Sequence, residues 1–163
     1  MLVRKYQTMF NQNVQIGSTK SKLCVITEEK CEEYTNYSSL SSPESVADLV
    51  NTLYNLCDLT EEYVYLLAVD TKNVPIGAFE VSHGTVDCSV VAPREIFMRA
   101  LLCGAAKIVL AHNHPSGNVN PSSEDIKLTE RIKQAGDIMG MPLLDHIIVG
   151  DNEFFSFKQE NYM

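Results

Sequence analysis

The chain has 163 residues, of which 45% are hydrophobic and 21% are charged. This is the composition of one ordinary globular domain, and it excludes a disordered tail or a repeat array. Thirteen Lys and Arg against 21 Asp and Glu give a formal net charge of -8. Because the field of such a chain repels polyphosphate, the charge disfavours direct binding to nucleic acid.

The cysteines and the apolar stretches of the chain indicate where in the cell the protein is expected. The five cysteines form no Cys-x-x-Cys pair, and an odd number leaves one unmatched in any disulfide scheme. We therefore expect a reducing, cytoplasmic location and no cysteine metal site. The most apolar stretch, residues 101–111, is interrupted by Gly104 and Lys107, so we expect no membrane span.

Residues 1–41 are polar and weakly patterned, and we expect a strand-like or partly flexible segment there. A single domain is predicted to follow over residues 42–163, where the first firm periodicity begins. Within the first segment, apolar residues favour one strand pair built on Val14, Ile16, Leu23, Val25 and Ile26.

The first predicted elements of the domain are a helix and a β-hairpin. Ser42 can cap the helix and Pro43 suits its first position. Apolar residues then recur at helical spacing from Val46 to Leu56. An apolar run, a polar turn and a second strand-like run predict the hairpin over residues 61–82.

Two further helices and two strands are predicted downstream. Pro93 begins a helix that Gly104 can end. Residues 105–111 form a short apolar run typical of a central strand that is buried on both faces. Helical periodicity then continues to about Met139, and residues 143–150 are predicted as a second interior strand. This order indicates an α/β fold, with a mixed β-sheet and helices packed against it.

Two histidines stand where the predicted central strand ends. In extended backbone residues i and i+2 project to the same side, so the imidazoles of His112 and His114 can converge on one ion. Ser122 and Asp125 stand three residues apart at the start of the next helix, and the intervening turn brings a carboxylate back toward the histidines. Two neutral imidazoles and one carboxylate form the ligand set of an open catalytic zinc site. The sequence thus predicts Zn²⁺ bound by His112, His114 and Asp125.

A hydrolytic zinc site also needs a proton carrier outside the ligand set, usually a carboxylate. Our prediction is Glu80, on the second strand of the hairpin, where alternation puts its side chain opposite Phe79 and Val81. Glu95 is the alternative, although the helix dipole also explains a carboxylate in the first turn of a helix. Ser122 either donates its hydroxyl to the oxyanion of a tetrahedral intermediate or caps the helix, and both roles need the same location.

The remaining histidines are predicted to have other roles. His83 precedes Gly84, and we expect it at a surface turn. Asp145 and His146 open the final group of strands. We expect these two residues to accept an imidazole N–H or to fix the end of the strand, and not to be metal ligands.

Together, Glu80, His112-x-His114-Pro and Ser122-x-x-Asp125 resemble the JAMM (JAB/MPN+) metalloprotease signature. The segments HNHPSG, PSSED and LLDHIIVG are similar specifically to the bacterial RadC family, and the similarity extends over most of the chain. The resemblance implies a JAB/MPN-like α/β fold, close in broad layout to cytidine deaminases. It also implies zinc ligation by the two histidines and Asp125, general acid/base chemistry by Glu80, and assistance to the oxyanion by Ser122.

The chemistry implied by the resemblance is hydrolysis of an amide or isopeptide bond in a peptide or protein substrate. A second reading is a non-catalytic accessory protein of DNA repair or recombination with a structural metal site, since the family name records an association with repair. A metal-dependent nuclease ranks last. The residues of an HNH nuclease are spread over a ββα unit, and a set of two histidines and one aspartate prefers zinc to Mg²⁺ or Mn²⁺. Whether the chain forms a homo-oligomer is left open by the sequence.

Overall fold

A computed structural model describes residues 2–16, 19–33, 39–84, 91–151 and 153–163 of the chain. Its elements in chain order are β1 (Leu2–Ile16), β2 (Thr19–Glu33), α1 (Pro43–Tyr54), the 3-10 helix η1 (Leu56–Asp58), β3 (Tyr63–Val69), β4 (Pro75–His83), α2 (Pro93–Leu102), β5 (Lys107–Asn113), α3 (Ser123–Met139), β6 (Leu143–Val149) and β7 (Phe154–Ser156). The helices α1 to α3 and the strands β3 to β6 follow one another in the predicted order. The strand pair expected in the first segment is present as β1 and β2.

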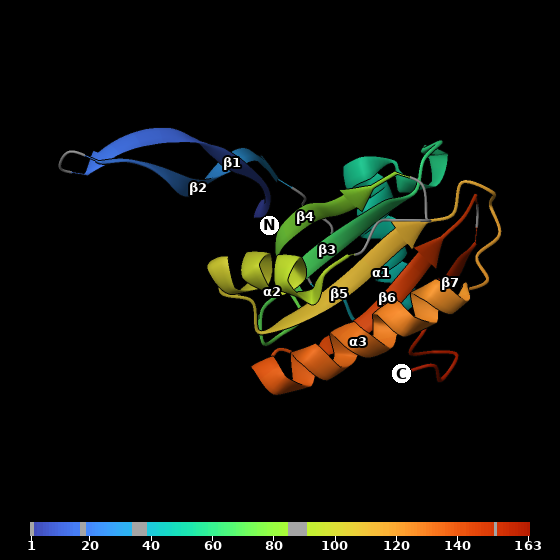
Figure 1. Ribbon diagram of the computed structural model, residues 1–163. Coiled ribbons are helices and arrows are strands. Elements are labelled where there is room, and N and C mark those ends of the chain that lie inside the picture. Colours follow the sequence, from blue (N-terminus) through green and yellow to red (C-terminus); the bar gives the residue numbers. More distant parts are fainter. Residues whose placement is uncertain (1, 17–18, 34–38, 85–90, 152) are drawn as a thin grey trace.

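The strands form one mixed sheet in the order β2-β1-β4-β3-β5-β6-β7. β5 and β6 run parallel, whereas β3 pairs antiparallel with β4 and β5, and β7 pairs antiparallel with β6. The hairpin of β1 and β2 joins β4 through the pairing of Lys5 with Ala78, and it extends away from the other strands (Figure 1). The strands from β4 to β7 therefore form the body of the sheet.

Helix α1 begins where the sequence predicts. Ser42 is the N-cap, and its Oγ accepts from the backbone N–H of Ser45 at 3.4 Å. The Ser45 hydroxyl completes the capping box by accepting from the Ser42 N–H at 3.2 Å. Pro43 occupies the first turn, where its missing N–H costs no hydrogen bond. The helix ends at Asn55, whose φ of 52° is the left-handed conformation common at helix C-termini.

The helices cover both faces of the sheet, with α1 on one face and α2 and α3 on the other (Figure 1). Each face has its own hydrophobic core. The core under α1 includes Leu49, Val50, Leu67, Val109 and Ala111. The core under α2 and α3 includes Ile96, Ile132, Leu66, Ile108 and Leu110.

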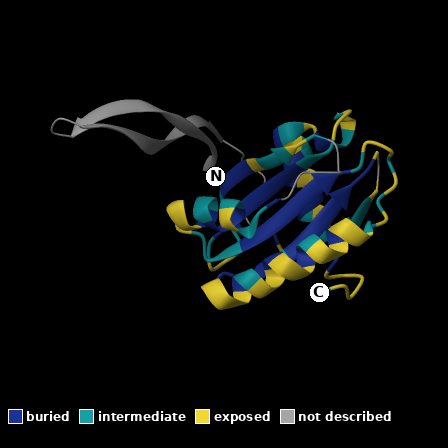
Figure 2. Cartoon of the chain, in the orientation of Figure 1, coloured by how far each residue is buried: buried dark blue, intermediate teal, exposed yellow. Residues whose placement is uncertain are grey.

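Strand β5 is buried on both faces, as predicted for a central strand. Val109 and Ala111 belong to the core under α1, whereas Ile108 and Leu110 belong to the core under α2 and α3. Because side chains alternate along a strand, His112 continues the second series and faces the side of α3. Figure 2 shows the buried sheet beneath the exposed outer side of α3.

The predicted fold class is confirmed, since the chain forms a mixed sheet with helices packed against it. Within the described part of the chain, the helices lack the length and apolarity needed to cross a membrane.

Candidate metal centre

The chain turns sharply at the end of β5. His112 is 1% exposed and lies one residue before the end of the strand. The backbone N–H of His114 donates to the carbonyl of Val149 at 3.2 Å, which ties the second histidine to β6. Gly117 donates to the His114 carbonyl at 2.9 Å, and its φ of 75° is one that glycine adopts without strain. This turn keeps both imidazoles at the same end of the sheet.

Asp125 reaches the site from the first turn of α3. Its backbone N–H donates to Oγ of Ser122, the N-cap, at 3.1 Å. Its Oδ2 accepts from the Ser122 N–H at 2.8 Å and from the Ser122 hydroxyl at 2.6 Å. The capping box therefore fixes the carboxylate as well as the helix start. Ser122 is thus the helix cap, and its role at an oxyanion stays a prediction.

The structure brings the three predicted ligands together, and we call these side chains the metal cluster. His112 Nε2 lies 3.1 Å from His114 Nε2 and 3.3 Å from Asp125 Oδ1. His114 Nε2 lies 3.5 Å from Asp125 Oδ2. One ligand atom from each residue lies within 4.8 Å of the others. A tetrahedral zinc ion with bonds of about 2.0–2.1 Å places its ligands roughly 3.3 Å apart, which is close to these separations.

The donor chemistry of the metal cluster also fits a cation. His114 Nδ1 lies 2.6 Å from the carbonyl oxygen of Asn118. Because a carbonyl only accepts, Nδ1 carries the hydrogen, and Nε2 presents a lone pair when the ring is neutral. Asp125 presents carboxylate oxygens toward the same point. Acceptors that face one another need a proton or a metal ion between them, and this set suits Zn²⁺ with one coordination position left over.

The pKa values of the metal cluster are shifted by the hydrogen bonds among its own residues. Burial alone would raise the pKa of Asp125, but hydrogen bonds with His112 and His114 outweigh burial and hold it far below its ordinary value. The pKa of His114 is raised, mainly by its hydrogen bond with Asp125. Both shifts favour a protonated imidazole beside an ionised carboxylate, and a bound metal ion would take the place of that proton.

His146 lies behind His112, on the side away from the metal cluster. Its Nε2 is 2.8 Å from His112 Nδ1, and its Nδ1 is 2.7 Å from Oγ1 of Thr129 in α3. The ring of Phe157 stacks on it, with centroids 4.8 Å apart. Burial lowers the pKa of His146 well below its ordinary value. The residue thus stands where the sequence analysis expects a group that accepts an imidazole N–H.

Glu80, the predicted proton carrier, lies on the other face of the sheet. It pairs across the strands with Tyr65, a residue of the core under α1. His112 pairs with Val64, a residue of the core under α2 and α3. Glu80 lies opposite Phe79, as alternation along the strand predicts, but Phe79 shares the face of His112. The structure therefore separates Glu80 from the metal cluster.

The other polar residues considered from the sequence have local partners. The exposed side chain of His83 bonds through Nδ1 to Glu80 Oε1 at 2.8 Å. Glu95, the alternative proton carrier, forms an ion pair at 3.1 Å with Arg99, one turn along α2. Neither His83 nor Glu95 joins the metal cluster.

Among the described residues, Glu62 is a carboxylate on which the charges of the metal cluster act. It precedes β3, and alternation from Val64, the partner of His112, puts it on the cluster side of the sheet. Partial burial raises the pKa of its carboxyl, and the charges of the cluster also act on it. Glu62 is not singled out by its sequence pattern, because two adjacent glutamates before a strand are typical of an exposed turn. Strand alternation would have found it only if the pairing of β3 with β5 were known.

Asn113 is a second residue that the sequence analysis missed. Its side chain is buried, and its Oδ1 accepts from the backbone N–H of Tyr63 at 2.8 Å. Its Nδ2 donates to the carbonyls of Glu61 at 2.9 Å and Leu59 at 3.3 Å. These bonds hold the backbone on both sides of Glu62. The residue between the two histidines therefore fixes the segment that carries the facing carboxylate.

A family model described as the RadC-like JAB domain matches residues 40–162, about three quarters of the chain. The chain belongs to this RadC-like JAB domain family. Membership confirms the resemblance carried by the HNHPSG, PSSED and LLDHIIVG segments.

Curated proteins similar to this RadC-like chain carry the name UPF0758 protein. One from Clostridium novyi (strain NT) is 39% identical over 153 residues, which cover 91% of this chain and 66% of the relative. One from Clostridium botulinum (strain Eklund 17B / Type B) is 45% identical over 124 residues, covering 76% of this chain and 53% of the relative. One from Pelobacter propionicus is 44% identical over 128 residues, covering 78% and 55%. The chain thus spans about half to two thirds of the length of these relatives.

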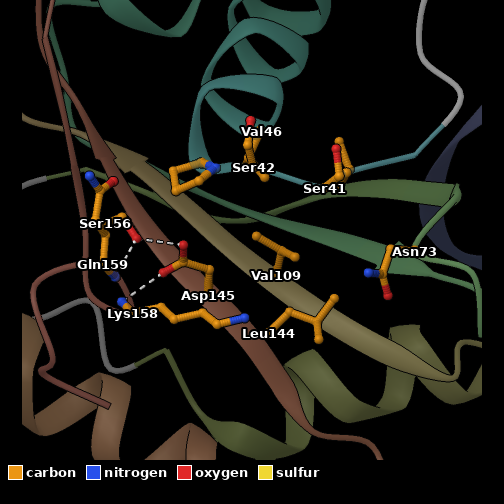
Figure 3. A pocket seen from close by; sticks show the side chains of 12 residues that line it. Ser41, Ser42, Val46, Asn73, Val109, Leu144, Asp145, Ser156, Lys158 and Gln159 are labelled. Atoms are coloured by element: carbon orange, nitrogen blue, oxygen red, sulfur yellow. Dashed lines mark hydrogen bonds between the residues drawn. The ribbon is translucent and has the colours of Figure 1, made fainter.

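The RadC-like domain also has a pocket of about 400 Å³ on the face that α1 covers, lined in part by Val46 and Val109. Figure 3 shows that Asp145 in this pocket bonds to neighbouring residues. Its carboxylate accepts from the Ser156 hydroxyl at 2.6 Å and from the backbone N–H of Lys158 at 3.1 Å. The residues that line the pocket do not include the metal cluster, which faces the other side of the sheet.

Proposed function

We propose that this domain is a zinc-dependent hydrolase that cleaves a peptide or isopeptide bond in a peptide or protein substrate. The observation that supports it most directly is the convergence of the metal cluster, with Glu62 facing it from the same side of the sheet. Three protein ligands leave a coordination position open, as in catalytic zinc sites, whereas structural zinc sites are usually closed by four.

The ligand residues are held in place before any metal binds. His112, His114 and Asp125 would hold the ion, and the strand end, the turn and the capping box fix their positions. When bound, zinc would polarise a scissile carbonyl and acidify a water molecule. The His114 side chain is 16% exposed, so the metal cluster is not fully sealed from solvent.

Glu62 replaces Glu80 as the proposed proton carrier. Its carboxylate would accept a proton from the attacking water and pass the proton to the leaving amine. A carboxyl group with a raised pKa is a better match for this task near neutral pH than an ordinary glutamate. The Asn113 amide holds the backbone on both sides of Glu62, so the segment that carries the carboxylate is anchored.

The test is hydrolysis of a panel of peptide and isopeptide-linked substrates by the purified chain, with added Zn²⁺ and with a chelator. We expect turnover to stop on chelation and to return when zinc is restored. The Glu62→Gln variant should lose about 10²–10⁴-fold in turnover, because its amide cannot carry a proton, while zinc content stays unchanged. The matched Glu80→Gln variant should retain turnover, because that side chain lies on the other face of the sheet.

Two outcomes would contradict the proposal at different levels. Full activity of Glu62→Gln together with an inactive Glu80→Gln would overturn the assignment of the proton carrier. A chain that binds zinc but cleaves no member of the panel in a chelator-sensitive way would overturn the hydrolase itself. That second result would favour the accessory role in DNA repair or recombination.

A further inference from the structure

A chain of hydrogen bonds connects two residues of the metal cluster through the protein interior. It begins at the backbone carbonyl of Asp125, which accepts from the Thr129 hydroxyl at 2.6 Å. Thr129 Oγ1 lies 2.7 Å from His146 Nδ1. His146 Nε2 in turn lies 2.8 Å from His112 Nδ1. Neither Thr129 nor His146 contributes a ligand atom to the metal cluster.

The hydrogens along this chain can be assigned one by one. A carbonyl oxygen only accepts, so the single hydrogen of the Thr129 hydroxyl is used on Asp125. The contact with Thr129 therefore requires that His146 donate from Nδ1. A neutral imidazole has one N–H, so His146 Nε2 accepts, and His112 must donate from Nδ1. In the neutral ring that can ligate a metal, the remaining nitrogen of His112, Nε2, then carries the lone pair, and it is the atom that points into the metal cluster.

We propose that Thr129 and His146 are positioning residues that select the tautomer of His112 and hold its Nε2 lone pair toward the metal. The inference rests on the metal site of the proposed function but not on hydrolysis. In the opposite tautomer of His146, an Nε2–H would meet the Nδ1–H of His112. Relief of that contact would move the hydrogen of His112 to Nε2, where it blocks metal ligation.

The packing around His146 leaves it little freedom to turn away. The ring is 0% exposed and stacks on Phe157 with an interplanar angle of 13°. Its backbone N–H donates to Asp145 Oδ1 at 2.8 Å, and its carbonyl accepts from the N–H of Phe157 at 3.0 Å. Thr129 is 1% exposed, so bulk water cannot replace its hydroxyl as the acceptor for the Nδ1 hydrogen of His146. The direction of donation is therefore set by the protein.

Two substitutions at Thr129 separate this role from simple packing. Thr129→Val keeps the volume and removes the hydroxyl, whereas Thr129→Ser keeps the hydroxyl and removes a methyl group. We expect Thr129→Val to bind added ZnCl₂ about 10–100-fold more weakly in competition with a chromophoric chelator, as found when the outer partner of a metal-binding histidine is lost. Thr129→Ser should bind zinc within about threefold of wild type. A packing role predicts the reverse order, because only the serine leaves a cavity.

The tautomers themselves are read by ¹⁵N chemical shifts of the imidazole nitrogens. In the unsubstituted chain we expect His146 to carry its hydrogen on Nδ1, both without metal and with zinc, and zinc-loaded His112 to carry its hydrogen on Nδ1. A hydrogen on His146 Nε2, or zinc binding by Thr129→Val equal to that of the unsubstituted chain, would overturn the proposal. If the unsubstituted chain binds no zinc, the proposed function fails, and the His146 shifts alone decide the tautomer. If zinc binds and follows the expected order without any hydrolysis, only the hydrolase proposal fails.

Discussion

Asn113 and its two histidine neighbours act on different parts of the molecule. Side chains alternate along β5, so the amide of Asn113 points away from the face that His112 occupies. On the other side, the amide forms the hydrogen bonds with the backbone before β3 that a neighbouring strand would otherwise form. A buried amide with three hydrogen bonds is costly to remove. Each backbone group that is left without a partner lowers the stability of the fold by about 1–3 kcal/mol.

We expect Asn113→Ala to bind zinc normally but to lose hydrolysis. Without the amide, the backbone around Glu62 loses its anchor, and a displacement of about 1 Å in a proton carrier costs about 10²-fold in rate. Zinc stoichiometry, turnover and hydrogen exchange of the Tyr63 amide would be measured, and the Tyr63 amide should exchange faster. The control is Gln134→Ala, an exposed amide on α3 that should change none of these. Unaltered turnover in Asn113→Ala would show that Glu62 needs no such anchor.

The site could be predicted from the sequence where its residues are close together in the chain. The spacing of His112 and His114, and the capping position of Asp125, are local patterns, and the structure brings all three together. Glu62 could not be found in this way, because its place depends on which strand lies beside β5. Alternation within β4 correctly puts Glu80 opposite Phe79, but it does not specify on which side of the sheet the metal cluster lies.

Helix α3 is the element that connects the metal cluster to the rest of the fold. Its first turn supplies Asp125, its second supplies Thr129, and Ile132 packs into the core below. Near its end, Gly136 lies against the turn that leads to β6. A Cβ at this position would approach the carbonyl oxygen of Met141 to 2.6 Å. The contact is with backbone, so a larger residue would have to displace the turn.

We expect Gly136→Ala to destabilise the domain although alanine is the better helix former. Helix propensity favours alanine by about 1 kcal/mol, but overpacking costs about 1–3 kcal/mol, and contact with backbone places the cost in the upper part of this range. Urea unfolding should show a net loss of about 1–2 kcal/mol. Ile138→Ala, at a side chain that is 86% exposed, should stay within about 0.5 kcal/mol of wild type. Equal stability of the two variants would contradict the close approach at Gly136.

Elements were easier to predict than their arrangement. Ser42 with Pro43, and Gly140 after α3, are helix signals that act within a few residues, and the helices begin and end there. The hairpin of β3 and β4 is likewise joined by a short turn. The insertion of β5 between β3 and β6 joins segments far apart in sequence, and no local pattern specifies it.

At the scale of the whole molecule, the metal cluster is an addition to a fold that has its cores already. The two hydrophobic cores lie on opposite faces of the sheet and do not include the ligand residues. We therefore expect the metal-free chain to remain folded. A metal that binds only the folded state should still stabilise it by mass action.

Zinc should raise the melting temperature in proportion to the logarithm of its free concentration. At a thousand times Kd the gain is about 4 kcal/mol, which for a domain of this size corresponds to roughly 10 °C. Differential scanning calorimetry with zinc and with excess chelator would measure it. The His114→Ala variant should melt near the chelated wild type and show no zinc response. A metal-free chain without a cooperative transition would contradict the view that the cores suffice.

The strict alternation of β5 makes the chemistry sensitive to chain length in a way that composition does not reveal. Adding or deleting one residue between Lys107 and His112 would exchange the two sides of the strand. The imidazoles would then project into the hydrophobic core beneath α1, and the side chain of Asn113 would lie on the side of Asp125. Substitutions that preserve volume inside this strand are therefore far safer for an engineer than any change in the number of its residues.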